Sequence, residues 1–377
     1  MEVLEQIKTF FIHNDSANST LAKRIVDIVP AEKIQWVNTR PFADRDGRLS
    51  SKEFSESKQH LFVAPFRGKF FKRCPGSRPG LTCCNYFVLN LGLQCNMNCS
   101  YCYLQSFINT PVMTAYSNLQ DALCELEDIG RSMADHMVRI GTGEVIDSLS
   151  LDPITLFSHD LIHFFRRYPK WRLEFKTKSD AVDQFLDVPH AGNIIVSWSI
   201  NPQNIIDKEE HGTASLDRRL RAAVKCRDKG FLISFHIDPM IWHKGWEKNY
   251  SELVEKITTL FRPEEIPAIS VGALRFQPEQ RHMMRERFGM DSLVNSAETF
   301  KCSDGKLRYD GQLRRRMYEH VVNAFKNKDS KWNIFLCMET PETWLQSMPS
   351  LPGTDPGLKD LFYNIKMPKP ASELGCQ

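Results

Sequence analysis

The sequence predicts an α/β protein built on a partial (β/α)6 TIM-like barrel, with an N-terminal extension and a C-terminal hairpin and helical region. From Asn85 onward, short runs of β-branched and aromatic residues alternate with longer amphipathic stretches, which is typical of parallel βα units. At 377 residues, the chain is also long enough for one large domain and a smaller one.

The repeating pattern gives each expected element a position. Strands are expected at 86–91, 138–141, 173–176, 194–200, 232–237 and 269–274, and helices at 119–137, 153–167, 215–229 and 250–261. Ser215 is a suitable N-cap for the third helix, Asp217 lies in its first turn, and Gly230 follows its last turn. Barrels of this kind carry their chemistry at the C-terminal ends of the strands.

Three regions follow from this pattern. Residues 1–84 form a polar N-terminal region, and residues 85–340 form the barrel, with a substrate-binding hairpin near 305–311 that is bounded by Gly305 and Gly311. Residues 341–377 are expected to be an irregular tail, because the periodicity ends there and prolines recur.

The composition is that of an ordinary globular protein, with 42% apolar and 25% charged residues. The first residues lack a basic signal-peptide segment, and no apolar run approaches the roughly 18 residues of a membrane span. We therefore expect a cytoplasmic monomer without a membrane partner. The net charge of +3 neither demands nor excludes a nucleic-acid partner.

Cysteine is concentrated in one part of the chain. Seven of the eleven cysteines lie between Cys74 and Cys124, and in a reducing compartment such a cluster indicates metal binding or catalysis. The triad Cys95, Cys99 and Cys102 lies just after the first expected strand. Three thiolates can hold three irons of a cubane cluster and leave the fourth iron open. The alternative is a zinc site, but zinc usually requires four ligands in paired spacings.

The segment Cys95-Asn-Met-Asn-Cys99-Ser-Tyr-Cys102 resembles the Cys-x3-Cys-x2-Cys signature of the radical S-adenosylmethionine (SAM) superfamily. Further segments, in the same order, resemble the spore photoproduct lyase family over about residues 85 to 320. They are 99–106, 175–178, 198–201, Gly212-Thr213, 245–247 and Arg308-Tyr309.

The resemblance implies a function, two cofactors and two partners. The function is that of a DNA-repair lyase that cleaves a carbon–carbon bond of the methylene-linked thymine dimer. The cofactors are a 4Fe–4S cluster, held by the three cysteines, and SAM. The partners are lesion-containing DNA and a reductant such as flavodoxin or ferredoxin.

The resemblance also assigns residues to the SAM site. Gly141, Gly143 and Glu144 match the element that receives the amino group of SAM, and Lys178 and Ser199 match residues that contact SAM. Asn201 ends the same strand and joins this set. Alternatively, Gly141, Gly143 and Glu144 form a plain glycine-rich turn with a solvated glutamate. Lys178 could likewise be a solvated surface lysine.

Four further residues are candidates on the same basis. Tyr101 and Tyr103 match tyrosines that relay a hydrogen atom towards SAM, although packing is an equal alternative. Arg308 and Tyr309 match the pair that contacts the lesion, and a guanidinium beside an aromatic ring suits a phosphate and a base. Additional basic surfaces are possible at Arg314–Arg316 and at Lys69, Lys72 and Arg73, which are interleaved with Phe70 and Phe71.

At one position the chain departs from the family. The resemblance places a hydrogen-donor cysteine at the end of the second strand, where this sequence has Gly141. Cys74, Cys83 and Cys84 are candidate replacements, unless they are ordinary buried thiols. The departure leaves open the same chemistry on RNA, a peptide or a small molecule. A non-catalytic Fe–S or zinc protein would leave the residues at the strand ends unexplained.

Overall fold

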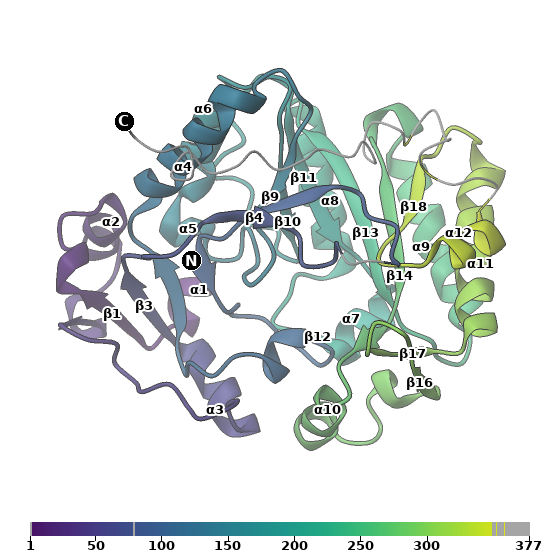
Figure 1. Ribbon diagram of the computed structural model, residues 1–377, viewed down its shortest axis with the longest axis horizontal. Coiled ribbons are helices and arrows are strands. Elements are labelled where there is room, and N and C mark those ends of the chain that lie inside the picture. The colour runs from purple at the N-terminus through teal and green to yellow at the C-terminus, as the bar shows by residue number, and fades with distance from the viewer. Residues whose placement is uncertain (1, 78–79, 349–351, 353–357, 359–377) are drawn as a thin grey trace.

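The computed structural model describes residues 2–77, 80–348, 352 and 358. Figure 1 shows a small N-terminal unit beside a larger curled β-sheet that has helices packed around it. This arrangement is the partial α/β barrel that the sequence predicts. Within 2–77 and 80–348, none of the helices combines the length and apolar content that a membrane crossing requires.

The N-terminal unit is a five-stranded sheet in the order β2-β1-β3-β8-β6. Its strands are β1 (Thr9–His13), β2 (Ile34–Val37), β3 (His60–Ala64), β6 (Gly92–Leu93) and β8 (Met113–Tyr116), and its neighbouring helices are α1 (Glu2–Gln6), α2 (Thr20–Ile28) and α3 (Ser51–Glu56). The sheet has a core of its own, which includes Phe10, Ile12 and Leu61. Because β6 and β8 come from beyond residue 84, this unit closes with the segment that carries the three cysteines.

The larger sheet has eight strands in the order β18-β14-β13-β11-β10-β9-β5-β4. Its bounds are β4 (Phe71–Arg73), β5 (Tyr86–Leu89), β9 (Arg139–Gly141), β10 (Arg172–Thr177), β11 (Ile194–Ser199), β13 (Leu232–Met240), β14 (Ile269–Ala273) and β18 (Ile334–Leu336). The strands from β5 to β18 are parallel, and β4 is antiparallel at the edge. All six expected strands are confirmed, and β4 and β18, each three residues long, extend the sheet.

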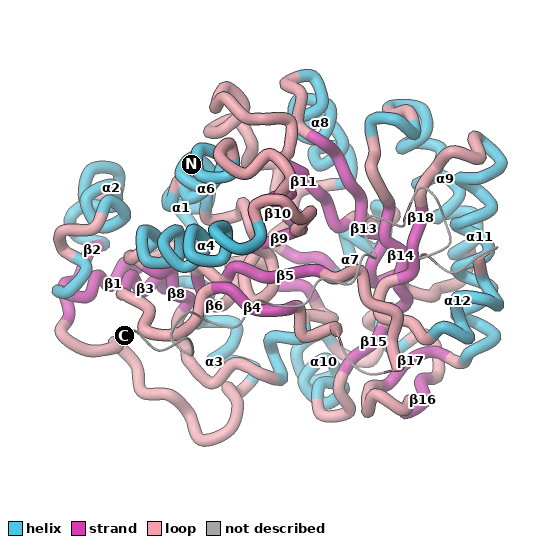
Figure 2. Tube along the Cα trace, turned by 45° about the horizontal axis from the view of Figure 1, so that its top comes forward, coloured by secondary structure: helices cyan, strands magenta, loops and turns pink. Residues whose placement is uncertain are grey.

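The remaining helices and short strands connect or cover this sheet (Figure 2). The helices are α4 (Leu119–Met133), α5 (Asp152–Thr155), α6 (Phe157–Phe165), α7 (Gln203–Glu209), α8 (Leu216–Asp228), α9 (Trp246–Leu260), α10 (Gln280–Phe288), α11 (Gly311–Lys328) and α12 (Pro341–Ser347). The short strands are β7 (Asn98–Cys99), β12 (Glu210–His211), β15 (Arg275–Phe276), β16 (Thr299–Lys301) and β17 (Leu307–Tyr309). The single helix expected at 153–167 is divided into α5 and α6 at Leu156, which has φ +51°.

The start of the expected irregular tail is instead helical. Thr340 caps α12, because its side chain accepts a hydrogen bond from the Thr343 N–H, and Pro341 occupies the first helical position. Trp344 anchors the helix in the core. The proline-rich remainder lies outside the described residues, apart from residues 352 and 358.

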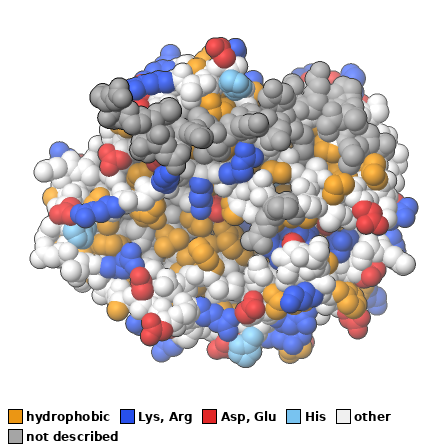
Figure 3. Space-filling model, in the orientation of Figure 1, with side chains coloured by type: hydrophobic (Ala, Val, Ile, Leu, Met, Phe, Trp, Pro, Cys, Tyr) orange, Lys and Arg blue, Asp and Glu red, His pale blue; other side chains and the backbone are white. Residues whose placement is uncertain are grey.

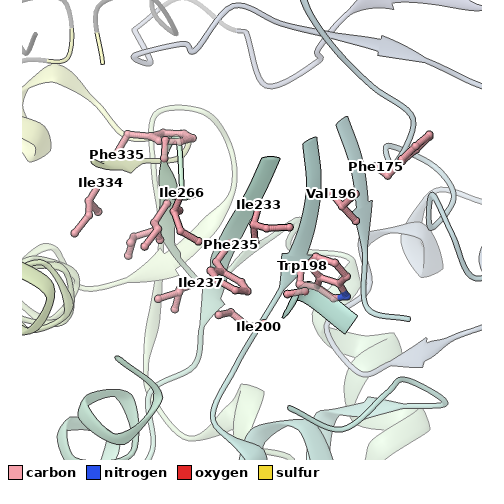
Figure 4. Packing of buried hydrophobic residues seen from close by; sticks show 14 of the residues in the cluster. Phe175, Val196, Trp198, Ile200, Ile233, Phe235, Ile237, Ile266, Ile334 and Phe335 are labelled. Carbon is pink, nitrogen blue, oxygen red and sulfur yellow. The ribbon is translucent and has the colours of Figure 1, made fainter. Parts of the chain in front are cut away.

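The larger sheet buries apolar side chains on one face and polar ones on the other. In β11, Val196 and Trp198 belong to the main apolar core that Figure 4 shows. Side chains alternate between the two faces of a strand, so Ser197, between these two residues, points to the opposite face. On that face its hydroxyl donates to Glu174 Oε1 at 2.7 Å. The inner face of the barrel is therefore polar rather than filled by aliphatic side chains.

A buried ion-pair network lies on this inner face. Glu174 contacts the Arg139 guanidinium at 2.7 Å and His236 Nε2 at 2.7 Å, and His236 Nδ1 lies 2.7 Å from Ser270 Oγ. Burial raises the pKa of the Glu174 carboxyl, but the charge of Arg139 and the bond from His236 outweigh it and hold that pKa below its usual range. Burial and the nearby Lys176 lower the pKa of His236 to about 4, so the imidazole is neutral at pH 7.

Candidate active site

The three-cysteine loop lies between β6 and β8 of the N-terminal sheet and is fixed on several sides. Lys58 Nζ donates to the carbonyl oxygens of Cys95 and Met97, each at 2.6 Å. The short strand β7, which contains Cys99, pairs with β12. Gln280 Nε2 in α10 donates to the carbonyl oxygen of Cys102 at 3.1 Å. The backbone of the loop is thus held in place by contacts from distant parts of the chain.

The thiols of this loop are in a partly apolar setting. Burial raises the pKa of Cys95 to about 11 and that of Cys99 to about 12, and Cys95 and Cys102 pack against the apolar cluster around Phe54. In the part of the chain that the structure describes, no three Cys, His, Asp or Glu side chains form a ready-made metal site.

Gly143 and Glu144 follow the end of β9. A Cβ at Gly143 would lie 2.9 Å from the Lys176 carbonyl oxygen, so glycine permits the loop to pass close to β10. The Glu144 side chain is 11% exposed and pairs with Lys72, whose Nζ lies 2.9 Å from Oε2. Lys69 is exposed and Lys72 has an acidic partner, whereas Phe70 and Phe71 are buried, so the two rings do not belong to the basic surface considered from the sequence.

Lys178 lies just beyond β10, between the cysteine loop and the end of the sheet. Its backbone N–H donates to Asp147 Oδ2 at 2.8 Å, and its Nζ lies 5.6 Å from the centre of the Tyr101 ring. Burial alone lowers the pKa of Lys178, but negative charge at Cys99 and Glu210 raises it above the usual value. The lysine is therefore a cation in a confined position rather than a solvated surface side chain.

Ser199 ends β11, Asn201 lies two residues beyond it, and both contact a buried cluster. The Ser199 carbonyl oxygen accepts from Arg219 Nη1 at 2.8 Å. Asn201 Nδ2 donates to Glu210 Oε1 at 3.0 Å, and Glu210 pairs with Arg219 at 2.7 Å. Tyr101 also donates its hydroxyl hydrogen to Glu210. The cluster connects the cysteine loop to the end of β11. Glu210 and Arg219 were not predicted as site residues, because no sequence motif marks them.

The two tyrosines beside Cys102 diverge. The Tyr101 hydroxyl lies in the buried cluster around Glu210, whereas the Tyr103 side chain is 47% exposed and donates to the Glu144 carbonyl oxygen at 2.5 Å. Burial raises the pKa of the Tyr101 phenol well above its usual value, so this hydroxyl keeps its proton. Tyr103 thus connects the cysteine loop to the loop after β9.

A hairpin is present, but it spans 299–309 rather than 305–311, because Gly305 lies in its turn and Gly311 begins α11; its two candidate residues are buried. β16 and β17 pair antiparallel, with a turn that includes Gly305 at φ +81°. Arg308 pairs with Asp304 at 2.6 Å, and the Tyr309 hydroxyl accepts from the Trp242 N–H at 3.1 Å. Neither side chain is free to meet a ligand in this arrangement, contrary to the direct contact expected from the sequence. The next three arginines are also ion-paired: Arg314 with Glu339, Arg315 with Glu319 and Arg316 with Glu247.

Comparison with known families decides the classification. The model of the spore photoproduct lyase family matches residues 9–327. The chain belongs to the spore photoproduct lyase family. The expectation drawn from the cysteine signature is thereby confirmed.

Individual relatives agree with the family match. Spore photoproduct lyase of Bacillus subtilis (strain 168) is 32% identical over 239 residues, which cover 63% of this chain and 70% of that protein. The Clostridium acetobutylicum protein is 24% identical over 306 residues, which cover 78% of this chain and 88% of that protein. The Geobacillus sp. (strain Y412MC61) protein is 28% identical over 205 residues, which cover 54% of this chain and 60%, less than two thirds, of that relative.

Solved structures confirm the fold. A spore photoproduct lyase mutant with bound AdoMet and dinucleoside spore photoproduct has a TM-score of 0.75 at 22% identity, covering 87% of this chain and 98% of that chain. The complex of spore photoproduct lyase with dinucleoside spore photoproduct has a TM-score of 0.75 at 21% identity. That match covers 88% of this chain and 98% of the solved chain. The partial barrel of this chain is thus the barrel of the spore photoproduct lyases.

Proposed function

We propose that this chain is a radical SAM lyase that splits the methylene-linked thymine dimer of DNA, the spore photoproduct. The observation that carries the proposal is the family match over residues 9–327, a span that contains the three-cysteine loop and the strand ends beside it. The named relatives are spore photoproduct lyases, and one solved relative holds AdoMet and dinucleoside spore photoproduct together.

In this proposal Cys95, Cys99 and Cys102 hold a 4Fe–4S cluster. Three thiols on one fixed loop fit such a cluster and leave one iron open for SAM. Assembly requires the thiols to lose their protons, because only thiolates bind iron, and to turn towards a common centre. When bound, the cluster, reduced by a flavodoxin- or ferredoxin-type donor, cleaves SAM and supplies the radical that removes hydrogen from the substrate.

The protein contributes binding groups for SAM at the strand ends. Glu144 would accept hydrogen bonds from the SAM ammonium, and the Lys178 cation would pair with its carboxylate. Gly141 and Gly143 would shape the loop that carries Glu144 towards the cofactor, because each leaves room for a neighbouring protein group, and Ser199 offers a hydroxyl. Asn201 is proposed to act through Glu210, since both of its amide atoms have protein partners.

A basic surface beside the cysteine loop supports DNA as the substrate. Arg281 and Arg285 in α10 form no ion pair with any other residue that the structure describes; Arg281 donates to Thr299 of the hairpin, and Arg285 contacts Asn295 at 3.4 Å. In Figure 1, α10 and the hairpin lie together at the lower edge, and Figure 3 shows Lys and Arg side chains along that edge. Guanidinium groups without acidic partners suit phosphate oxygens.

The other candidate residues have supporting roles in this proposal. Tyr101 and Tyr103, which flank Cys102 in the sequence, would relay hydrogen near the cofactor. Arg308 and Tyr309 hold the base of the hairpin and so position its exposed residues, among them Phe300, which is 52% exposed. Phe300 is an apolar side chain that an unstacked base can contact.

Anaerobic reconstitution tests the cofactor part of the proposal. The expected product is a brown protein with about four irons per chain, whose reduced form converts SAM to methionine and 5′-deoxyadenosine. A colourless protein that retains zinc would overturn it. If the protein cleaves SAM but does not act on the lesion, the radical SAM chemistry stands and the substrate is a different molecule.

A further inference from the structure

The phenol of Tyr86 occupies the place that a side chain at position 141 would take. A Cβ built on Gly141 would lie 1.6 Å from Tyr86 Oη and 2.3 Å from Cζ, and its three nearest heavy atoms all belong to Tyr86. Any residue larger than glycine at 141 would therefore expel the ring. Gly141 and Tyr86 form a complementary pair on the neighbouring strands β9 and β5.

Strand register places this pair on the polar inner face of the barrel. Gly141 is opposite Glu174 in β10, and Tyr86 is opposite Arg139 in β9. Glu174 and Arg139 belong to the buried inner network, and residues opposite one another in parallel strands face the same way. Gly141 is also the last residue of β9, so the Tyr86 hydroxyl lies just before the Thr142–Glu144 loop and at the same edge as the cysteine loop.

Within the part of the chain that the structure describes, the hydroxyl of Tyr86 has no hydrogen-bond partner, although the Arg139 guanidinium lies 5.0 Å from the ring centre. Burial and the charge of Glu174 raise the pKa of this phenol well above its usual range, so it keeps its hydrogen. The fully buried Tyr250, by contrast, makes two hydrogen bonds through its hydroxyl, whereas Tyr86 is only partly buried.

The proposed reaction needs one hydrogen atom at its end. Once hydrogen has been taken from the dimer and the carbon–carbon bond has broken, one thymine is left with an unpaired electron on its methylene carbon. Cys74 and Cys84 lie near Tyr86, but neither thiol is among the atoms nearest to position 141.

We propose that Tyr86 is the hydrogen-atom donor that converts this thymine radical to thymine. This inference rests on the proposed function. The Tyr86 O–H bond breaks homolytically and a C–H bond forms on the methylene carbon, so the thymine radical is reduced and Tyr86 is oxidised to a neutral phenoxyl radical. The phenoxyl regains one electron from the flavodoxin- or ferredoxin-type reductant and one proton from water.

The structure offers a matched control. Tyr168 also covers a glycine, because a Cβ on Gly130 would lie 2.6 Å from its Oη, but it stacks on Trp171 on the helical side of the sheet. Tyr168→Phe removes an equivalent hydroxyl outside the site. Tyr86→Phe removes the hydroxyl under study, and Gly141→Ala keeps it but displaces the ring.

The closing experiment follows deuterium from D2O into the thymine methyl group during turnover of dinucleoside spore photoproduct. Wild type and Tyr168→Phe should incorporate deuterium equally, whereas Tyr86→Phe and Gly141→Ala should each lose at least about tenfold in deuterated thymine. The double variant Tyr86→Ala/Gly141→Cys places a thiol in the vacated space and should recover part of the deuterated thymine. Equal deuterium incorporation in Tyr86→Phe and wild type would overturn this inference but leave the proposed function standing. A loss of incorporation seen only in Cys74→Ser, Cys83→Ser or Cys84→Ser would have the same consequence.

A second readout needs no cofactor. In apoprotein with 3-fluorotyrosine at position 86, the ¹⁹F resonance should shift when dinucleoside spore photoproduct is added, and the same label at 168 should not respond. A resonance at 86 that is unmoved at saturating dinucleoside contradicts the proposed contact. Wild-type enzyme that cleaves SAM and leaves the lesion intact overturns the proposed function and this inference together.

Discussion

Lys72 Nζ lies 2.9 Å from Glu144 Oε2, although the two residues come from the antiparallel edge strand β4 and the loop after β9. The ammonium of Lys72 thus occupies the side of Glu144 to which we assign the ammonium of SAM. Lys72 is 45% exposed and Glu144 11%, so the lysine can leave for solvent while the carboxylate stays in place.

Replacing Lys72 should therefore strengthen SAM binding. A pair with one exposed partner contributes about 0.2–1 kcal/mol, so Lys72→Met should lower the Kd for SAM by a factor of about 1.4 to 5. Equilibrium dialysis with reconstituted protein measures this. Lys69→Met, a change at an exposed neighbour, should leave the Kd unchanged, and weaker binding in Lys72→Met would show that the lysine assists the cofactor.

Each cysteine of the loop should be required for the cluster. Serine at 95, 99 or 102 should reduce iron from about four per chain to less than about one and abolish the visible absorption of the cluster. Cys124→Ser, at an exposed position on α4, is the control and should keep full iron. Full iron in any of the three loop variants would remove that residue from the ligand set.

The buried His236 should make stability depend on pH. Its pKa is about 4 in the folded chain against 6.5 in a free side chain, so the unfolded chain binds the proton first as pH falls. Its contribution is complete above about pH 6.5 and is lost towards pH 4, with about 2 kcal/mol of the free energy of unfolding lost between pH 7 and pH 5.

Denaturant unfolding at several pH values measures this loss. His236→Gln removes the titrating imidazole, so the difference between wild type and variant should shrink steadily from pH 7 to pH 5. A difference that does not change with pH would mean that His236 titrates normally in the folded protein.

The two arginines of α10 should contribute to DNA affinity through phosphates. Arg281→Gln and Arg285→Gln should each weaken binding of a lesion-containing duplex and reduce the slope of log K against log[salt] by about one. Arg315→Gln, at a position paired with Glu319 on α11, is the control. Unchanged slopes in both α10 variants would place the duplex elsewhere.

Much of the barrel and the cysteine loop could be predicted, because both depend on local sequence. Alternating apolar residues identify β11, and Cys95, Cys99 and Cys102 lie within eight positions of one another. The hairpin was also predictable from its turn glycine. The burial of Arg308 and Tyr309 was not, because it depends on Glu339 and Trp242, which are distant in the sequence.

The same limit applies to the contents of the site. Lys72 follows two phenylalanines in a segment that reads as a basic surface, and only the pairing of β4 with β5 turns it towards Glu144. Gly141 could be identified as a departure from the family, but the residue that fills its space comes from the neighbouring strand. Contacts of this kind depend on which residues of neighbouring strands lie opposite one another, and this register cannot be predicted from the residues of one strand.

The repair assay tests the central claim most directly. Reconstituted, reduced enzyme is incubated anaerobically with SAM and dinucleoside spore photoproduct, and thymine products are measured by mass spectrometry, with the Cys99→Ser variant as the blank. The account predicts thymine release that requires SAM and reductant and is absent in the blank. Enzyme that cleaves SAM while the dinucleoside remains intact would contradict it.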